Sequence, residues 1–180
     1  MRFEIRRLHE HYGLTTVYVT HDQAEALATA DYVVVMNQGQ IEQAGSAEEV
    51  YTAPRSRFVA RFIGGANVLE GQSVGGGVIA FGDTHIRCGS GDMAATNDIA
   101  VAIRTHDVKL AKCAATPEKD GNVVPGQVLK HSYLGSVRDY LVALKGGAQI
   151  RVIAPEDQIF DQGSEVIVVL PVEHCRALAA

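Results

Sequence analysis

Hydrophobic and polar positions alternate in two different ways along the chain, and the change falls near Gly64 and Gly65. Upstream, apolar residues recur with helical spacing or stand in short uncharged runs, which predicts helices alternating with strands. Downstream, short apolar runs are separated by glycine, aspartate, asparagine or proline, which predicts strands joined by tight turns. We therefore expect two domains, an α/β fragment at residues 1–64 and an all-β domain at residues 65–180.

The first domain is expected to contain a βαβ unit. Residues 14–19 form an uncharged run rich in β-branched side chains, which is typical of a strand buried on both faces of a parallel sheet. Asp22 precedes Glu25 in capping-box spacing and predicts a helix up to Ala30, and a second apolar run follows at residues 32–36. The remaining elements expected in this domain are helices at residues 2–12, 46–53 and 56–63 and a short hairpin strand at residues 41–43.

His21 lies between the expected strand at residues 14–19 and the helix that begins at Asp22. The carboxyl ends of strands in open α/β sheets are the edge at which ligands bind. A helix N-terminus presents unpaired N–H groups and the positive end of its dipole, which favour an anion. The sequence therefore predicts that His21 faces a phosphate group.

Short strands parted by glycine-containing turns dominate the second domain, and together they favour a small barrel or a sandwich, because a flat sheet would leave long unpaired edges. The two most apolar runs, residues 100–103 and 166–170, are expected to be central. Gly75, Gly76 and Gly77 are interpreted as a hairpin turn. Strands are expected at residues 67–74, 78–81, 85–88, 99–104, 126–131, 139–144, 149–153 and 165–170.

The charge, the length of the apolar runs and the spacing of the cysteines each exclude a class of function. The chain has 180 residues, 47% of them hydrophobic, and a net charge of −5 that is shared by both halves, so neither half offers the basic face of a nucleic-acid-binding protein. No apolar run approaches the roughly 20 residues that cross a bilayer, and the charged start is unlike a secretory signal, so we expect a cytoplasmic protein. Cys88, Cys113 and Cys175 are too widely spaced to predict a disulfide framework or a metal site.

The order of motifs in residues 1–69 resembles the C-terminal end of the nucleotide-binding subunit of an ABC importer. The resemblance is carried by Val-Tyr-Val-Thr-His-Asp-Gln-Ala-Glu-Ala at residues 17–26, Asn-Gln-Gly-Gln-Ile-Glu-Gln-Ala-Gly at 37–45, Ser-Ala-Glu-Glu-Val-Tyr-Thr-Ala-Pro at 46–54 and Phe-Val-Ala-Arg-Phe-Ile-Gly at 58–64. It implies that His21 is the switch, or H-loop, histidine, which contacts the γ-phosphate of ATP and helps to place the attacking water. It further implies ATP and Mg²⁺ as cofactors, a second copy of the ATPase subunit and membrane permease subunits as partners, and a place on the inner face of the cell membrane.

Several parts of such an ATPase are missing from the sequence. There is no Gly-x-x-x-x-Gly-Lys-Ser/Thr phosphate loop, no Leu-Ser-Gly-Gly-Gln signature and no acidic end of a Walker B strand. Because phosphoryl transfer depends on the positioning and charge stabilisation that those parts supply, we expect that this chain does not hydrolyse ATP by itself.

The second domain resembles the transport-associated OB domain that follows the ATPase domain in importers. The resemblance is carried by Val-Ala-Ile-Arg-Thr-His-Asp-Val-Lys-Leu at residues 101–110, Gly-Gln-Val at 126–128, Tyr-Leu-Gly at 133–135 and Tyr-Leu-Val at 140–142. Family members usually have Arg-Pro-Glu-Asp where this chain has Arg104-Thr105-His106-Asp107. The Tyr-Leu-Gly pattern favours the polyamine, iron, phosphonate or opine branch over the sugar branch.

Basic residues of this domain suggest a second function. Arg104, His106, Lys130, His131 and Arg138 could supply an anion or regulatory site, or they could be solvated charges that protect strand edges. The alternative to a piece of a transport ATPase is therefore a stand-alone regulatory, dimerisation or small-ligand-binding module.

Overall fold

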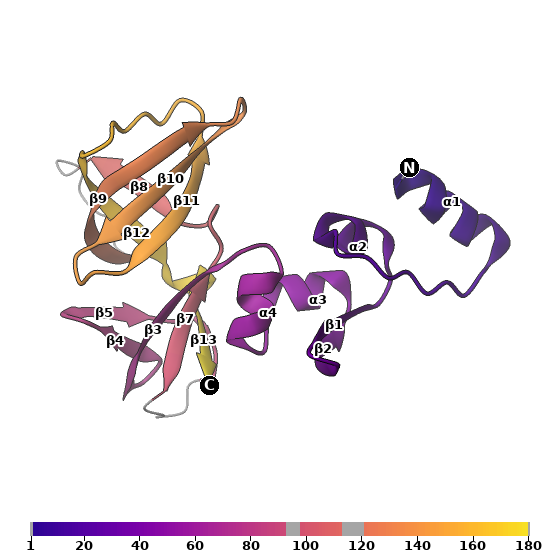
Figure 1. Ribbon diagram of the computed structural model, residues 1–180. Helices are drawn as coiled ribbons and strands as arrows, with labels where there is room; N and C mark the ends of the chain where they lie inside the picture. The colour runs from indigo at the N-terminus through magenta and orange to yellow at the C-terminus, as the bar shows by residue number, and fades with distance from the viewer. Residues whose placement is uncertain (1, 93–97, 113–120, 180) are drawn as a thin grey trace. The chain divides into compact units, whose positions relative to one another are not determined.

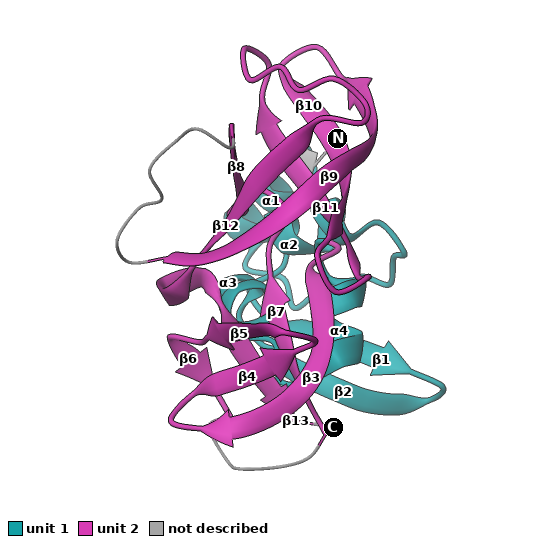
Figure 2. Cartoon of the chain, turned by 90° about the vertical axis from the view of Figure 1, so that its left-hand side faces the viewer, with its two compact units in different colours: residues 1–64 teal, residues 65–180 magenta. Residues whose placement is uncertain are grey.

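The computed structural model describes residues 2–92, 98–112 and 121–179, and the chain divides into two compact units, Met1–Gly64 and Gly65–Ala180. Figure 2 colours the units separately. Unit 1 contains the helices and one hairpin, whereas the described part of unit 2 is almost entirely β-structure. No helix among the described residues is long and apolar enough to span a membrane.

Two helices of unit 1, α2 and α3, begin where the sequence predicts capping residues. The side chain of Asp22 accepts a hydrogen bond from the Glu25 N–H, and Ser46 accepts one from the Glu49 N–H. Each bond satisfies an amide that the first helical turn leaves unpaired, so both predicted helix starts are confirmed. The helices are α1 (Arg2–Tyr12), α2 (Gln23–Thr29), α3 (Ala47–Thr52) and α4 (Arg57–Phe62).

The hairpin of unit 1 consists of β1 (Val33–Asn37) and β2 (Gln40–Gly45), paired antiparallel. Its inner face is buried through Val33 and Val35, which share a core with Val50 and Val59 of α3 and α4. The predicted hairpin is therefore confirmed, and its hydrophobic face is covered by helices from the same unit.

The strand predicted at residues 14–19 is not formed, so the predicted βαβ unit is wrong for this chain. These residues lie in an open connection between α1 and α2, outside any helix or strand (Figure 1). Val17 is 88% exposed and Val19 is 90% exposed. A strand buried on both faces needs neighbouring strands, and in the described part of unit 1 the sheet contains β1 and β2 alone.

Unit 2 is built from two antiparallel sheets, apart from one short parallel pairing of β13 with β6, and the expectation of a predominantly β domain is confirmed. One sheet has the order β11-β10-β9-β12-β8 and curls into a half-barrel (Figure 1), and the other has the order β5-β4-β3-β7-β13-β6. The strands are β3 (Asn67–Gly75), β4 (Val78–Phe81), β5 (Thr84–Arg87), β6 (Ser90–Gly91), β7 (Ile99–Ile103), β8 (Lys109–Lys112), β9 (Gly121–Tyr133), β10 (Val137–Leu144), β11 (Gln149–Pro155), β12 (Glu165–Pro171) and β13 (Arg176–Ala179), with a short 3₁₀ helix η1 (Val172–His174) before β13.

The two most apolar strands lie inside their sheets, as predicted. All five residues of β7 are buried between β3 and β13, and β12 lies between β9 and β8. The Gly75–Gly77 turn between β3 and β4 is also confirmed, since its glycines adopt φ values of 92°, 61° and 73°, which side-chain-bearing residues rarely adopt. Among the strands of the described residues, β6, β8 and β13 were not predicted.

Candidate functional site

His21 lies on a turn whose flanking residues form hydrogen bonds with each other, and its imidazole is exposed. The Tyr18 hydroxyl donates to the Glu25 carboxylate at 2.6 Å, and the Asp22 N–H donates to Thr20 Oγ1 at 2.9 Å. The hydrogen bond to Glu25 raises the pKa of Tyr18 above its ordinary value near 10. The turn is therefore fixed by side chains on both sides of His21, while His21 itself points to solvent.

The N-terminus of α2 does not offer an open anion site in this chain. Asp22 caps it with its own carboxylate, which accepts the Glu25 N–H at 3.0 Å, and the helix has only seven residues. This bond uses one of the amides that the first turn of α2 would otherwise leave unpaired. The residues present do not fit a complete nucleotide site, and His21 can contribute one contact to a site whose other groups come from elsewhere.

Two of the candidate anion ligands in unit 2, Arg104 and His106, lie in the turn after β7. Arg104 is 8% exposed, and His106 is exposed beside Asp107. Asp107 lies between two imidazoles, with His106 Nε2 at 3.7 Å and His174 Nδ1 at 3.5 Å. His106, which stands where the family usually has glutamate, therefore shares the Asp107 carboxylate with His174 of η1. The sequence did not predict this arrangement, because His174 is 67 positions from Asp107.

Arg138 belongs to a different neighbourhood. Its Nε donates to the Glu156 carbonyl oxygen at 2.8 Å, and its guanidinium lies over the Tyr133 ring, 5.1 Å from the centroid. These contacts connect β10 with the end of β9 and with the loop after β11. Arg138 thus has a structural role at the β9–β10 hairpin in addition to any contact with a ligand.

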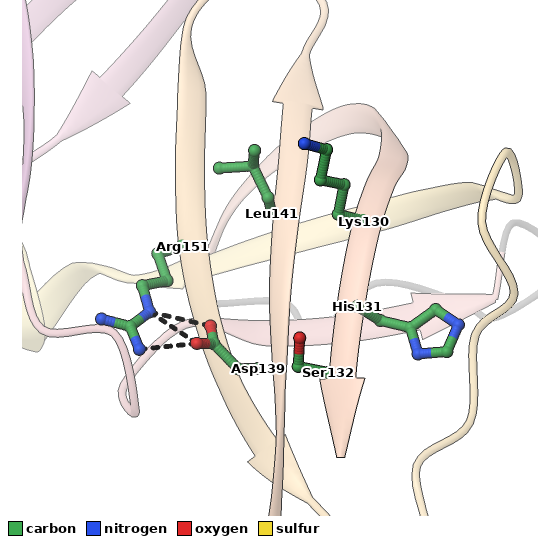
Figure 3. Close-up of a pocket in the computed structure, with 6 residues that line it drawn as sticks. All are labelled: Lys130, His131, Ser132, Asp139, Leu141 and Arg151. Atoms are coloured by element: carbon green, nitrogen blue, oxygen red, sulfur yellow. Dashed lines mark hydrogen bonds and ion pairs between the residues drawn. The ribbon is translucent and has the colours of Figure 1, made fainter. Parts of the chain in front are cut away.

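An open pocket of about 230 Å³ lies on the outer face of β9, β10 and β11 (Figure 3). Leu141 is directly opposite Lys130 on one neighbouring strand and Arg151 on the other. Asp139 holds Arg151 through bonds that include Nε to Oδ1 at 2.8 Å, and this pairing raises the pKa of Arg151. The pocket is lined by Lys130, His131, Ser132, Asp139, Leu141 and Arg151.

Only part of the predicted set of basic residues meets at this pocket. Lys130 and His131 line it, although Figure 3 shows that the His131 ring points away from the other five side chains. Arg151 and Asp139 were missed by sequence reasoning. The alternation of polar and apolar residues along β10 and β11 was the available signal, since it places 139, 141 and 151 on one face.

The described cysteines have no exposed reactive thiol. Cys88 and Cys175 are both buried and unpaired, and burial raises their pKa values to about 11 and about 12. Cys113 lies outside the described residues. Across the parts of the chain that the structure describes, no group of three or more histidine, cysteine, aspartate or glutamate side chains could hold a metal ion.

The chain is similar to one domain family and to the ATP-binding proteins of several importers. Residues 101–178 match the family model of the TOBE domain. A spermidine/putrescine import ATP-binding protein from Thermobifida fusca is 35% identical over 79% of this chain and 38% of its own length. A sulfate/thiosulfate import ATP-binding protein from Burkholderia mallei is 40% identical over 81% of this chain and 40% of its own length.

Longer matches exist as well. A second spermidine/putrescine import ATP-binding protein, from Pseudomonas aeruginosa, is 36% identical over 166 residues, which are 86% of this chain and 44% of the relative. The chain thus spans about two fifths of the length of the curated relatives it matches. Among solved structures, the cytoplasmic molybdate-binding protein ModG has a TM-score of 0.55 at 15% identity, covering 63% of this chain and 96% of that protein, which shows a shared fold. The chain therefore carries a TOBE domain and is homologous to the C-terminal region of the ATP-binding subunits of ABC importers.

Proposed function

We propose that this chain is the C-terminal portion of the ATP-binding subunit of an ABC importer, in which ATP hydrolysis drives solute uptake. One observation carries the proposal: similarity to import ATP-binding proteins extends over 166 residues and so reaches far beyond the TOBE domain at residues 101–178. Residues 1–64 would then be the end of an α/β nucleotide-binding domain. The partners would be a second ATPase subunit and membrane permease subunits, at the cytoplasmic face of the membrane.

His21 is the residue of this chain that would touch the nucleotide. In the complete subunit, ATP with Mg²⁺ would be held mainly by residues upstream of this chain, and His21 would supply one contact to the γ-phosphate. The fixed turn from Tyr18 to Glu25 supports this role, because it holds the backbone around His21 in place while the imidazole remains accessible. Preorganised polar groups stabilise transition-state charge better than mobile ones.

The test is a chimera that fuses this chain in frame to the upstream part of the Thermobifida fusca relative. We expect ATP hydrolysis by the chimera, and a fall in kcat of about 100-fold or more for His21→Ala, since a positioned acid–base or polar group contributes on that order. The control is His11→Ala, which removes another exposed histidine of unit 1. Equal activity of the His21→Ala chimera and its parent would refute the role of His21.

The isolated chain gives a second measurement. We expect no measurable ATP affinity by calorimetry, because no glycine-rich phosphate loop is present in the sequence and Asp22 caps α2. Micromolar binding of ATP to the 180-residue chain would contradict this expectation, because it would require a phosphate-binding site other than a glycine-rich loop or the N-terminus of α2.

Small-anion binding by unit 2 is a second candidate function, favoured by the pocket beside Lys130 and by the fold shared with a molybdate-binding protein. Lys130 has no acidic partner among the described residues, whereas Arg151 is paired with Asp139. Calorimetry with molybdate and with sulfate tests this candidate. Binding should weaken at least tenfold in Lys130→Ala and persist in Lys145→Ala, a control at an exposed hairpin tip; absence of binding to the parent chain rejects the candidate.

A further inference from the structure

Gln23, the first residue of α2, is hydrogen bonded to the last residue of unit 1. Its Oε1 accepts the Gly64 N–H at 2.9 Å, across 41 positions of sequence. Gly64 has a φ of 70°, a conformation that glycine adopts readily and other residues rarely do. Since Gln23 follows His21 by two positions, this bond joins the turn that carries the imidazole to the point at which the chain leaves unit 1.

Helix α2 is attached to the rest of unit 1 near both of its ends. All seven of its residues are at least partly exposed, and Leu27 packs against the core of the unit from a partly buried position. At the C-terminal end, the Arg6 guanidinium of α1 donates to the Thr29 carbonyl oxygen at 3.2 Å. At the N-terminal end, beside His21, the bond from Gly64 to Gln23 has the corresponding role. A helix with little buried surface depends on such bonds for its position.

The Gly64 amide is a firm anchor because the residue before it is buried. Ile63 is 4% exposed and belongs to the core cluster that also contains Val59 of α4. Its N–H donates to the Val59 carbonyl oxygen at 2.8 Å, which closes the C-terminal turn of α4. Core packing therefore sets the position of Gly64, and Gln23 transfers that position to the first turn of α2.

We propose that Gln23 is a positioning residue for His21, because its bond to Gly64 keeps the first turn of α2, and with it the imidazole, in one place. This inference rests on the proposed function and adds a residue to the same site. A polar group that is fixed before the reaction stabilises transition-state charge without reorganisation at the moment of reaction. Loss of the bond should therefore lower kcat for ATP hydrolysis more than it weakens ATP binding.

Amide hydrogen exchange at Gly64 in the 180-residue chain tests the bond itself. Gln23→Ala removes the acceptor, so we expect exchange at Gly64 to accelerate by about threefold or more. Gln23→Glu keeps an oxygen acceptor at the same position and should retain the parent rate. Gln40→Ala, at an exposed glutamine of β2, is the matched control and should also retain it.

Kinetics of the chimera with the upstream part of the Thermobifida fusca relative test the role of the bond. Gln23→Ala should lower kcat about tenfold and leave the KM for ATP within about twofold, since misplacement of a catalytic group by about 1 Å can cost up to about 100-fold in rate. Gln23→Glu should restore the parent kcat. In a chimera that already carries His21→Ala, Gln23→Ala should change kcat by less than about twofold, because a residue that acts through His21 has no effect once the imidazole is absent.

Three results would overturn the inference while the proposed function stands. They are an active parent chimera whose kcat is unaffected by Gln23→Ala, an equal loss of kcat in the presence and in the absence of His21, and exchange at Gly64 that is the same in the parent chain and in Gln23→Ala. The second result would make Gln23 a structural residue of unit 1 only. An inactive parent chimera rejects the proposed function, and the positioning role of Gln23 is rejected with it.

Discussion

The side-chain amide of Asn67 pairs with the main chain of Arg151 through two hydrogen bonds of 2.8 Å, one donated by Asn67 Nδ2 to the Arg151 carbonyl oxygen and one accepted by Asn67 Oδ1 from the Arg151 N–H. Asn67 begins β3 in the six-stranded sheet, and Arg151 lies on β11, the edge of the five-stranded sheet. The amide thus takes the place of a neighbouring strand for one residue. It joins the two sheets at an edge that would otherwise be open.

Asn67→Ala should destabilise unit 2 by about 1 kcal/mol, because two hydrogen bonds are lost at a site where water can replace part of them. The measurement is denaturant unfolding, with amide exchange of Arg151 as the local readout. Gln127→Ala serves as the control, since its exposed side chain donates one bond to the Gly163 carbonyl oxygen. If Arg151 exchanges at the parent rate in Asn67→Ala, the amide does not protect this edge.

Asn122 makes the same type of pair in a buried setting. Its Oδ1 accepts from the Arg87 N–H at 2.6 Å and its Nδ2 donates to the Arg87 carbonyl oxygen at 2.8 Å, so β9 is tied to the edge strand β5. Asn122 is 8% exposed. Asn122→Ala should therefore cost about 2–3 kcal/mol in the free energy of unfolding, more than Asn67→Ala, because unpaired backbone groups remain in a site with little access to water. Equal losses for the two variants would show that burial does not set the difference.

Tyr140 anchors the loop after β11 from inside the half-barrel. It is fully buried, its hydroxyl donates to the Gln158 carbonyl oxygen at 2.6 Å, and the hydroxyl oxygen of Tyr140 accepts the Phe160 N–H at 3.3 Å. Tyr140→Phe should lower stability by about 1–2 kcal/mol, since both partners lose the hydroxyl while the ring packing remains. Tyr133→Phe is the matched control at an exposed position, where we expect less than about 0.5 kcal/mol. Faster exchange of the Phe160 amide in Tyr140→Phe alone would identify the loop as the part that loosens.

Local signals in the sequence were sufficient for the helices and for most strands. Asp22, Ser46 and the Gly75–Gly77 turn act through neighbours within a few positions, so their effect can be predicted without knowing the rest of the fold. The strand at residues 14–19 was predicted from its composition, but a strand requires a pairing partner, and composition does not reveal whether one is present.

The candidate sites were harder to predict because they depend on which strands become neighbours. His174 reaches Asp107, and Asp139 reaches Arg151, only after the strand order is set. The Thr105 carbonyl accepts the Ile153 N–H at 2.9 Å, so the turn that carries Arg104 and His106 lies beside β11, far from it in sequence. Contacts of this kind arise from register and sheet closure, which a single sequence does not specify.

The buried cysteines predict a loss of stability at alkaline pH. Burial raises the pKa of Cys88 from its ordinary value near 9 to about 11, and that of Cys175 to about 12, with the neighbouring Cys88 adding to the second shift. Below pH 9 both thiols are protonated in the folded and unfolded states, so pH has no effect through them. Between pH 9 and about 11 the unfolded chain loses these protons and the folded chain keeps them, so the free energy of unfolding falls as the pH rises.

The measurement is urea unfolding at pH 8 and pH 10 in a Cys113→Ser background, which removes the third thiol. The slope contributed by each buried thiol is at most about 1.4 kcal/mol per pH unit. Adding Cys88→Ala should reduce the difference between the two pH values, and adding Cys175→Ala should reduce it further, even though each variant lowers the stability at pH 8 by removing buried volume. The quantity to compare between variants is therefore the difference in unfolding free energy between pH 8 and pH 10, and not the unfolding free energy at one pH. A difference that stays the same in all three backgrounds would show that other groups, such as the exposed lysines and tyrosines, account for the alkaline loss.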